Sequence, residues 1–236
     1  METKKYLIIS MGVLIWAWPA RGVLDDKIFT SSGQIVAGEE WDIVNIYNDD
    51  TVVDMLGGSA DYISTFDGSS LNVVDGYAEV GAFDYSTINI SGGYIHLATA
   101  LNNTTVNFFM SDYTDALIAE DSGTVNMEGG TVERAIARNS GTANLYAGSV
   151  TDYLSAYDTT VINIYGYGLV LSSGGGTYGD GRVYGYWLDG NAFVINLRGA
   201  ESQSHINLIP EPATVALLAM GGLLLQRHGR ILEKVI

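Results

Sequence analysis

A short sequence unit recurs along the chain at intervals of 17 to 19 residues, and this repeat constrains the fold more than any other feature. Each unit contains a triplet in which a polar residue stands between two apolar residues. A unit of this length cannot bury an apolar face alone, so the units must stack on one another. The central residues of the triplets form one column, which we expect to act as a structural ladder: Asp54, Asn72, Asn89, Asn107, Asn126, Asn144 and Asn163.

Two other columns keep the same phase as the triplets. Glycine pairs such as Gly92-Gly93 suit corners that need a positive φ, and the Asp or Asn residues before each triplet suit turns. When identical units stack, their strands pair in parallel at one rung spacing. The repeat therefore predicts an all-β chain that folds as a single-stranded parallel β-helix, or β-solenoid, with rungs of about 18 residues. The turn column consists of Asp67, Asp84, Asn102, Asp121, Asn139 and Asp158.

A hydroxyl column lies two residues before the central column. Alternate residues of a strand face opposite sides, so Val125 and Met127 share one face while Thr124 and Asn126 share the other. We expect the apolar pair to be buried and the hydroxyl and amide columns to lie on the outer face; a bend that turns the amides inward is the alternative. The hydroxyl column is a candidate binding face and consists of Ser70, Thr87, Thr105, Thr124 and Thr142. Regular outward Thr columns resemble the ordered surfaces of ice-binding β-solenoids.

The composition describes a strongly acidic chain without disulfides. The sequence has 27 acidic residues against 11 basic ones, a net charge of −16, and no cysteine. Such a field repels phosphates, so nucleic acid and anionic membranes are poor partners, while cationic polymers and divalent cations are attracted. Stability must come from packing and backbone hydrogen bonds, because no disulfide can form.

The N-terminus predicts export. Lys4 and Lys5 form a positive segment, 6–18 is apolar, and Ala20-Arg21-Gly22 is a cleavage site of the small-x-small kind. These features indicate a signal peptide over residues 1–22. A permanent anchor is disfavoured, because spanning a bilayer takes about 20 apolar residues.

The C-terminus combines a Pro-Glu-Pro tripeptide, a short apolar run and a basic end. The tripeptide is Pro210, Glu211 and Pro212, the apolar run covers 213–225, and Arg227 and Arg230 follow. This segment resembles the PEP-CTERM sorting tail of Gram-negative bacteria. The resemblance implies that an exosortase, an integral-membrane transpeptidase, holds the chain transiently at the inner membrane. It would then remove the tail while the protein passes to the cell surface or to extracellular polymer.

These features divide the chain into four segments. We expect a signal peptide at 1–22, an N-terminal cap at 23–43 with Trp41 over the first rung, a solenoid at 44–208, and a sorting tail with a hydrophobic helix at 209–236. A Gly- and Tyr-rich insertion interrupts the solenoid at 166–190. The triplet pattern returns at 194–197 and 205–208, which we expect to be the last strands.

Motifs for catalysis are missing from the sequence, so we expect no enzyme, no catalytic residues and no cofactor. Asp67 and Asp84 stand one rung apart and leave a glycan lyase or hydrolase as a less favoured alternative. Calcium binding stays an alternative at Asp49-Asp50 and at Asp112 with Asp115, because their carboxylates can supply oxygen ligands. Arg134 and Arg138 are expected to pair with acids such as Glu120.

The hypothesis that accounts for most of these features is an exported structural protein of the cell surface, extracellular matrix or biofilm. Its partners would be the exosortase and extracellular polysaccharide. The alternative is a solenoid that binds polysaccharide or ice.

Overall fold

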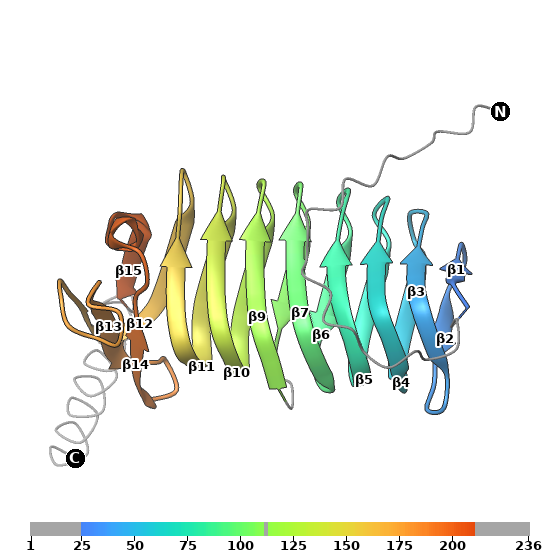
Figure 1. Cartoon of the computed structure of the whole chain (residues 1–236), viewed down its shortest axis with the longest axis horizontal. Helices are drawn as coiled ribbons and strands as arrows, with labels where there is room; N and C mark the ends of the chain where they lie inside the picture. Colours follow the sequence, from blue (N-terminus) through green and yellow to red (C-terminus); the bar gives the residue numbers. More distant parts are fainter. Residues whose placement is uncertain (1–24, 111–112, 211–236) are drawn as a thin grey trace, which may run out of the picture.

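The chain forms a rod in which parallel β-strands stack rung upon rung for about eight turns. The computed structural model describes residues 25–110 and 113–210. Figure 1 shows the strands side by side along the long axis, with the N-terminal rungs (blue) and the C-terminal strands (orange to red) at opposite ends. The prediction of an all-β parallel β-solenoid is confirmed.

Each rung supplies one strand segment to each of two parallel sheets. Long strands such as β10 bend at a glycine corner and serve both sheets, whereas β6 with β7, and β8 with β9, divide the same path into two strands. The strands of the stack are β1 (Lys27–Phe29), β2 (Gly33–Ile35), β3 (Glu40–Ile46), β4 (Val52–Thr65), β5 (Ser70–Ala82), β6 (Thr87–Ile90), β7 (Tyr94–Leu101), β8 (Thr105–Phe108), β9 (Tyr113–Glu120), β10 (Thr124–Arg138), β11 (Thr142–Ala156), β12 (Val161–Ser172) and β15 (Ile206–Pro210).

The triplets define the first of these sheets, which we call the ladder sheet. It contains β2, β6, β8, β15 and the first parts of β4, β5, β10, β11 and β12. The second sheet contains β1, β3, β7, β9 and the later parts of β4, β5, β10 and β11. Successive triplets pair in register, so that Asn89 lies between Asn72 and Asn107.

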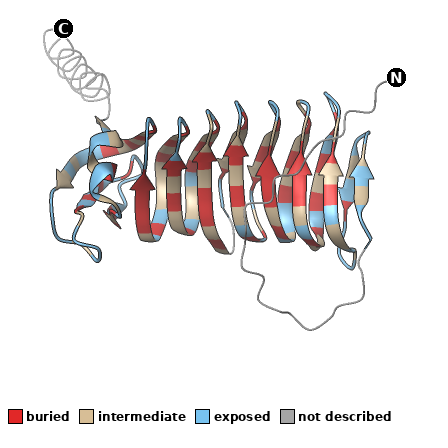
Figure 2. Cartoon of the chain, turned by 45° about the horizontal axis from the view of Figure 1, so that its top comes forward, coloured by how far each residue is buried: buried red, intermediate tan, exposed pale blue. Residues whose placement is uncertain are grey.

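The core lies between the two sheets and is built from columns of apolar side chains. On the ladder sheet, Leu71, Ile88 and Val106 follow one another in register and are fully buried. Each side chain of this kind contributes ~1.5–3 kcal/mol through burial. Small residues form a column on the second sheet, where Ala100 and Ala119 are fully buried. Figure 2 shows buried residues (red) as bands that recur along the rod.

Two kinds of corner close each rung. At one corner the second glycine of a pair adopts a positive φ, 78° at Gly93 and 71° at Gly130. At the other corner the predicted turn residues lie in the left-handed region, with φ of 52° at Asp67 and 50° at Asp84, a conformation in which Asn and Asp are enriched.

Buried hydroxyls supply hydrogen bonds at the second kind of corner. Ser69 is fully buried; its Oγ accepts the Phe66 N–H at 3.2 Å and donates to the carbonyl of Ile46, one rung earlier, at 3.1 Å. Ser86 repeats this arrangement with Phe83 and Thr65. The corners are therefore tied to the preceding rung as well as closed on themselves.

The segment expected to be an N-terminal cap takes part in the parallel pairing. The segment expected to be a cap contains β1 and β2, which already pair in parallel with β3 and β4. Trp41 belongs to β3, pairs with Ala60 and has the Lys27 ammonium 5.0 Å from its ring centroid. These first strands are short and lack the complete triplet, so the sequence repeat does not reveal them.

The C-terminal end is closed by an antiparallel sheet. Much of the predicted insertion at 166–190 consists of the end of β12 and of β13 (Arg182–Tyr186). The strands expected at 194–197 and 205–208 correspond to β14 (Ala192–Asn196) and β15, and β14 pairs antiparallel with β13. The hairpin carries its own apolar face, Val183, Phe193 and Ile195, and this face covers the core. The 3-10 helix η1 (Ala200–His205) then leads into β15, which returns to the parallel stack beside β12.

Candidate functional site

An uninterrupted ladder of side-chain amides runs along the ladder sheet. From Asn72 to Asn163, the Asn Nδ2 of each rung donates a hydrogen bond to the Oδ1 of the corresponding residue one rung earlier, at 2.8–2.9 Å. The ladder begins at Asp54 and passes through the predicted residues Asn72, Asn89, Asn107, Asn126, Asn144 and Asn163. Asn207 of β15 adds a further step, donating to Asn163 at 3.1 Å.

The ladder has one polarity throughout. Asp54 stands at its N-terminal end, where a carboxylate, which can only accept, receives the Asn72 N–H. Each internal amide uses one N–H and one oxygen lone pair along the ladder, which leaves a second N–H and a second lone pair. The ladder thus stabilises the stack and still presents donors and acceptors at every rung.

The hydroxyl column lies beside the ladder. Thr87, Thr105 and Thr124 follow one another in register, with Ser70 and Thr142 at the ends of the row. These residues and the amides are half-buried, whereas the apolar residues between them are buried. The alternation places both polar columns on the outer face and excludes the alternative in which the amides turn inward.

A second polar surface, which we did not predict, occupies the outer face of the second sheet. Tyr77, Tyr94 and Tyr113 lie in register, with ring centroids 5.4 and 5.1 Å apart along the row. His96 Nδ1 lies 2.5 Å from Asp115 Oδ2, and the Tyr113 hydroxyl donates to the Glu133 carboxylate. The spacing of these tyrosines, which is that of the repeat, is the signal that could have revealed the row.

The electrostatics of this surface follow from its crowding of acidic groups. Burial raises the pKa of Glu79, while the neighbouring His96 lowers it. Burial and then the charge of Glu79 raise the pKa of Tyr62 to about 12. The hydrogen bond to Glu133 raises the pKa of Tyr113 above its ordinary value. These groups pair with one another along the rod rather than around an enclosed cavity.

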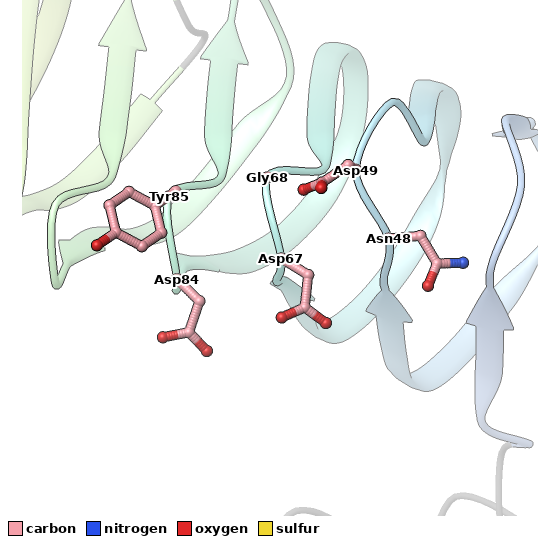
Figure 3. A pocket seen from close by; sticks show the side chains of 6 residues that line it. All are labelled: Asn48, Asp49, Asp67, Gly68, Asp84 and Tyr85. Atoms are coloured by element: carbon pink, nitrogen blue, oxygen red, sulfur yellow. The ribbon is translucent and has the colours of Figure 1, made fainter. Parts of the chain in front are cut away.

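The carboxylates of the turn column line an open groove of about 810 Å³ (Figure 3). Figure 3 shows the side chains of Asp67 and Asp84 pointing the same way, with Asp49 apart from them. Asp115 lies on the second sheet, and Asp112 lies outside the described residues. Over 25–110 and 113–210, no group of three or more His, Asp or Glu side chains is placed to hold a metal ion. The lining residues are Asn48, Asp49, Asp67, Gly68, Asp84 and Tyr85.

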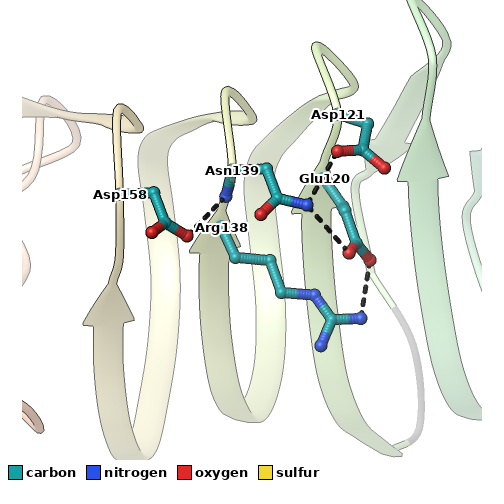
Figure 4. A network of polar contacts seen from close by, with 5 residues as sticks. All are labelled: Glu120, Asp121, Arg138, Asn139 and Asp158. Atoms are coloured by element: carbon teal, nitrogen blue, oxygen red, sulfur yellow. Dashed lines mark hydrogen bonds and ion pairs between the residues drawn. The ribbon is translucent and has the colours of Figure 1, made fainter.

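Further along the same edge the turn residues form a polar network (Figure 4). Arg138 Nη2 lies 2.6 Å from Glu120 Oε2, the pairing that the sequence predicted. Asn139 Nδ2 donates to Glu120 at 3.2 Å and to Asp121 at 2.7 Å, and its backbone N–H donates to Asp158 at 3.3 Å. Neighbouring corners are thereby cross-linked along the rod.

The predicted sorting motif begins where the described body ends. Pro210 is the last residue of β15 and pairs with Gly166. Glu211, Pro212, Arg227 and Arg230 lie outside the described residues, as does the predicted signal peptide. Within the described part of the chain, no helix has the length and apolar character needed to cross a membrane.

Comparisons of this chain with protein-family models, with curated proteins and with solved structures find no match.

Proposed function

We propose that the protein is an exported structural component of the cell surface or extracellular matrix, routed by its N-terminal signal and its exosortase-type tail. The observation that supports this proposal best is the amide ladder. It runs in one polarity from Asp54 to Asn207 and binds the rungs into a single rod. A polar column of this kind stabilises shape, and shape is what a matrix component contributes.

The distribution of charge supports the same role. The chain carries a net charge of −16 and exposes carboxylates at its corners, including Asp67 and Asp84. A surface of one sign keeps a rod soluble and hydrated and attracts divalent cations or cationic polymers. We propose no catalytic role, because the most crowded titratable groups are paired with one another on an open sheet face.

Intact mass spectrometry of the protein from its native host, in cell-bound and released fractions, tests the export route. We expect loss of residues 1–22 and cleavage near Pro210-Glu211-Pro212. An intact C-terminus in a soluble fraction would contradict the sorting proposal and leave the solenoid without an assigned destination.

A second candidate function is binding of ice or polysaccharide through the hydroxyl column. The in-register row of Thr87, Thr105 and Thr124 favours it, because a flat, regular array of hydroxyls can match a regular ligand. The double substitution Thr105→Lys and Thr124→Lys should abolish thermal hysteresis in an ice-growth assay. The matched control is Thr131→Lys on the second sheet, which is exposed and lies away from the row.

A further inference from the structure

A groove of about 440 Å³ lies where the ladder sheet meets the turn between β13 and β14. One wall belongs to the outer face of the rungs, and the other belongs to the turn, which is far away in sequence. This volume is in the range of small-molecule sites. The groove is lined by Asn126, Glu128, Tyr146, Ala147, Leu188 and Asp189.

The turn that forms the second wall is held in place by its neighbours. Trp187 is 2% exposed, its Nε1 donates to the carbonyl of Gly148 at 2.9 Å, and its ring stacks on Phe193 at 3.9 Å. The Asp189 carboxylate accepts the Asn191 N–H at 2.9 Å and the Asn191 Nδ2 at 2.8 Å. The wall is therefore preformed, which lowers the entropy cost of binding.

The first wall offers an aromatic surface. Tyr146 stacks on Tyr165 with centroids 4.3 Å apart and an interplanar angle of 17°. Tyr165 does not line the groove, whereas Glu128 does and acts electrostatically on Tyr146. Tyr165 covers one face of the Tyr146 ring, so the face available to a ligand is the other one.

The polar groups of the groove complement hydroxyls. Asn126 donates one N–H to Asn107 and accepts one from Asn144, each at 2.8 Å, and so keeps one donor and one acceptor site for a ligand. Glu128 and Asp189 add carboxylate oxygens, which accept hydrogen bonds from hydroxyl groups. A flat aromatic face flanked by acceptors and a donor is suited to a sugar ring, which has an apolar face and a hydroxyl rim.

The charge of the groove decides which charge class of glycan it can bind. Among the described residues, no Lys, Arg or His lines the groove, whereas two carboxylates do. An anionic glycan would be repelled by these groups and by the net charge of the chain. A cationic amino sugar would gain little over a neutral one, because Glu128 and Asp189 are both exposed and ion pairs at exposed positions are screened by solvent.

We propose that this groove is a binding site for a neutral, hydroxyl-rich glycan chain, with Tyr146 as the stacking platform and Glu128, Asp189 and Asn126 as hydrogen-bonding groups. This assignment goes beyond the structural role and does not depend on the export route. It would give the rod an attachment point for uncharged polysaccharide near its C-terminal end.

Isothermal titration calorimetry of the full chain tests the site with defined probes. The neutral probes are β-1,4-linked hexamers of glucose, mannose, xylose and N-acetylglucosamine; the charged probes are hexagalacturonate and a chitosan hexamer. We expect at least one neutral hexamer to bind. The affinity should fall about tenfold in Glu128→Gln, through loss of a charge-assisted hydrogen bond, and at least as much in Tyr146→Ala.

Two controls keep the result specific. Tyr85→Ala removes a tyrosine that is 74% exposed at the turn-column groove and should leave binding unchanged. Glu128 is exposed, so Glu128→Gln tests the site even where Tyr146→Ala disturbs the rungs. The proposal is overturned when no neutral hexamer binds, when only a charged probe binds, or when binding is lost in the Thr105, Thr124 double variant but kept in Glu128→Gln. None of these outcomes affects the mass-spectrometric test of export.

Discussion

The first residue of the amide ladder has to accept a hydrogen bond only, whereas the internal residues have to donate one and accept one. Asp54 only accepts from Asn72, so a carboxylate suffices there. Asn107 must donate to Asn89 and accept from Asn126, so it needs an amide. A carboxylate at Asn107 would turn oxygen toward oxygen, and a partly buried acceptor without its donor is costly.

We therefore expect opposite outcomes for two charge-changing substitutions. Asn107→Asp should lower stability by about 1–3 kcal/mol, whereas Asp54→Asn, which keeps the accepting oxygen, should be nearly neutral. Thermal unfolding followed by circular dichroism at neutral pH measures both. Because a protonated carboxyl can donate, the deficit of Asn107→Asp should shrink as the pH approaches about 4. Equal melting temperatures for the two variants would show that the ladder adds little stability.

Glu79 on the second sheet makes stability depend on pH. Burial raises its pKa in the folded chain, so the folded state binds the proton more tightly than the unfolded state. The stability contribution of Glu79 is then largest at low pH and is lost as the pH rises through the folded-state pKa.

Glu79→Gln should accordingly raise the melting temperature at neutral pH and have little effect below about pH 4, where the wild-type carboxyl is protonated. Glu128→Gln, at an exposed position, is the control and should change the melting temperature little at either pH. A lower melting temperature for Glu79→Gln at neutral pH would mean that attraction to His96 outweighs the cost of burial.

At the scale of the element, the corners decide how closely rungs approach. Gly93 has a φ of 78°, and a Cβ there would lie 2.8 Å from the carbonyl oxygen of Gly76 in the preceding rung. Gly38 has a φ of 89°, but a Cβ there would have no atom within 4 Å. Only the first position combines an unfavourable conformation with a backbone clash.

Replacing each glycine with alanine separates the two effects. Gly38→Ala should cost about 1 kcal/mol through backbone strain alone, and Gly93→Ala should cost clearly more, because a backbone carbonyl cannot move without shifting a rung. Chemical denaturation of both variants measures the difference. Similar costs would indicate that the glycine corners tolerate a wider rung spacing than the structure has.

At the scale of the whole molecule, the two ends of the rod differ in how their strand edges are protected. Exposed strand edges invite pairing with other chains. Over the described residues, the stack begins with two three-residue strands, β1 and β2, and Lys27 lies beside the aromatic rings of Phe29 and Trp41. The C-terminal end is covered by the β13–β14 hairpin, and a hydrogen bond from Trp187 to the carbonyl of Gly148 holds this hairpin against the rungs.

Trp187→Ala should therefore release the C-terminal cover. A buried Trp→Ala change costs ~3–5 kcal/mol, and in a stack of nearest-neighbour contacts the loss stays local. Hydrogen exchange should show protection lost in β13 and β14 but kept in β5 to β8, and light scattering should detect self-association. Tyr184→Ala, at a residue that is 39% exposed, is the control. Uniform loss of protection would show that the rod unfolds as one cooperative unit.

What the sequence determined by itself is the repeated part of the fold. Columns represented by Asn89, Asp84 and Gly93 recur every 17 to 19 residues. Units with the same local conformation and the same length stack on one another. The parallel stacking, the ladder column and the corner residues could be predicted for this reason, whereas the number of sheets in each rung could not. Tertiary structure alone decided the ends and the surfaces between distant segments. The hydrogen bond from Trp187 to Gly148 joins residues 39 positions apart, so no local pattern encodes the antiparallel cover or the groove that depends on it.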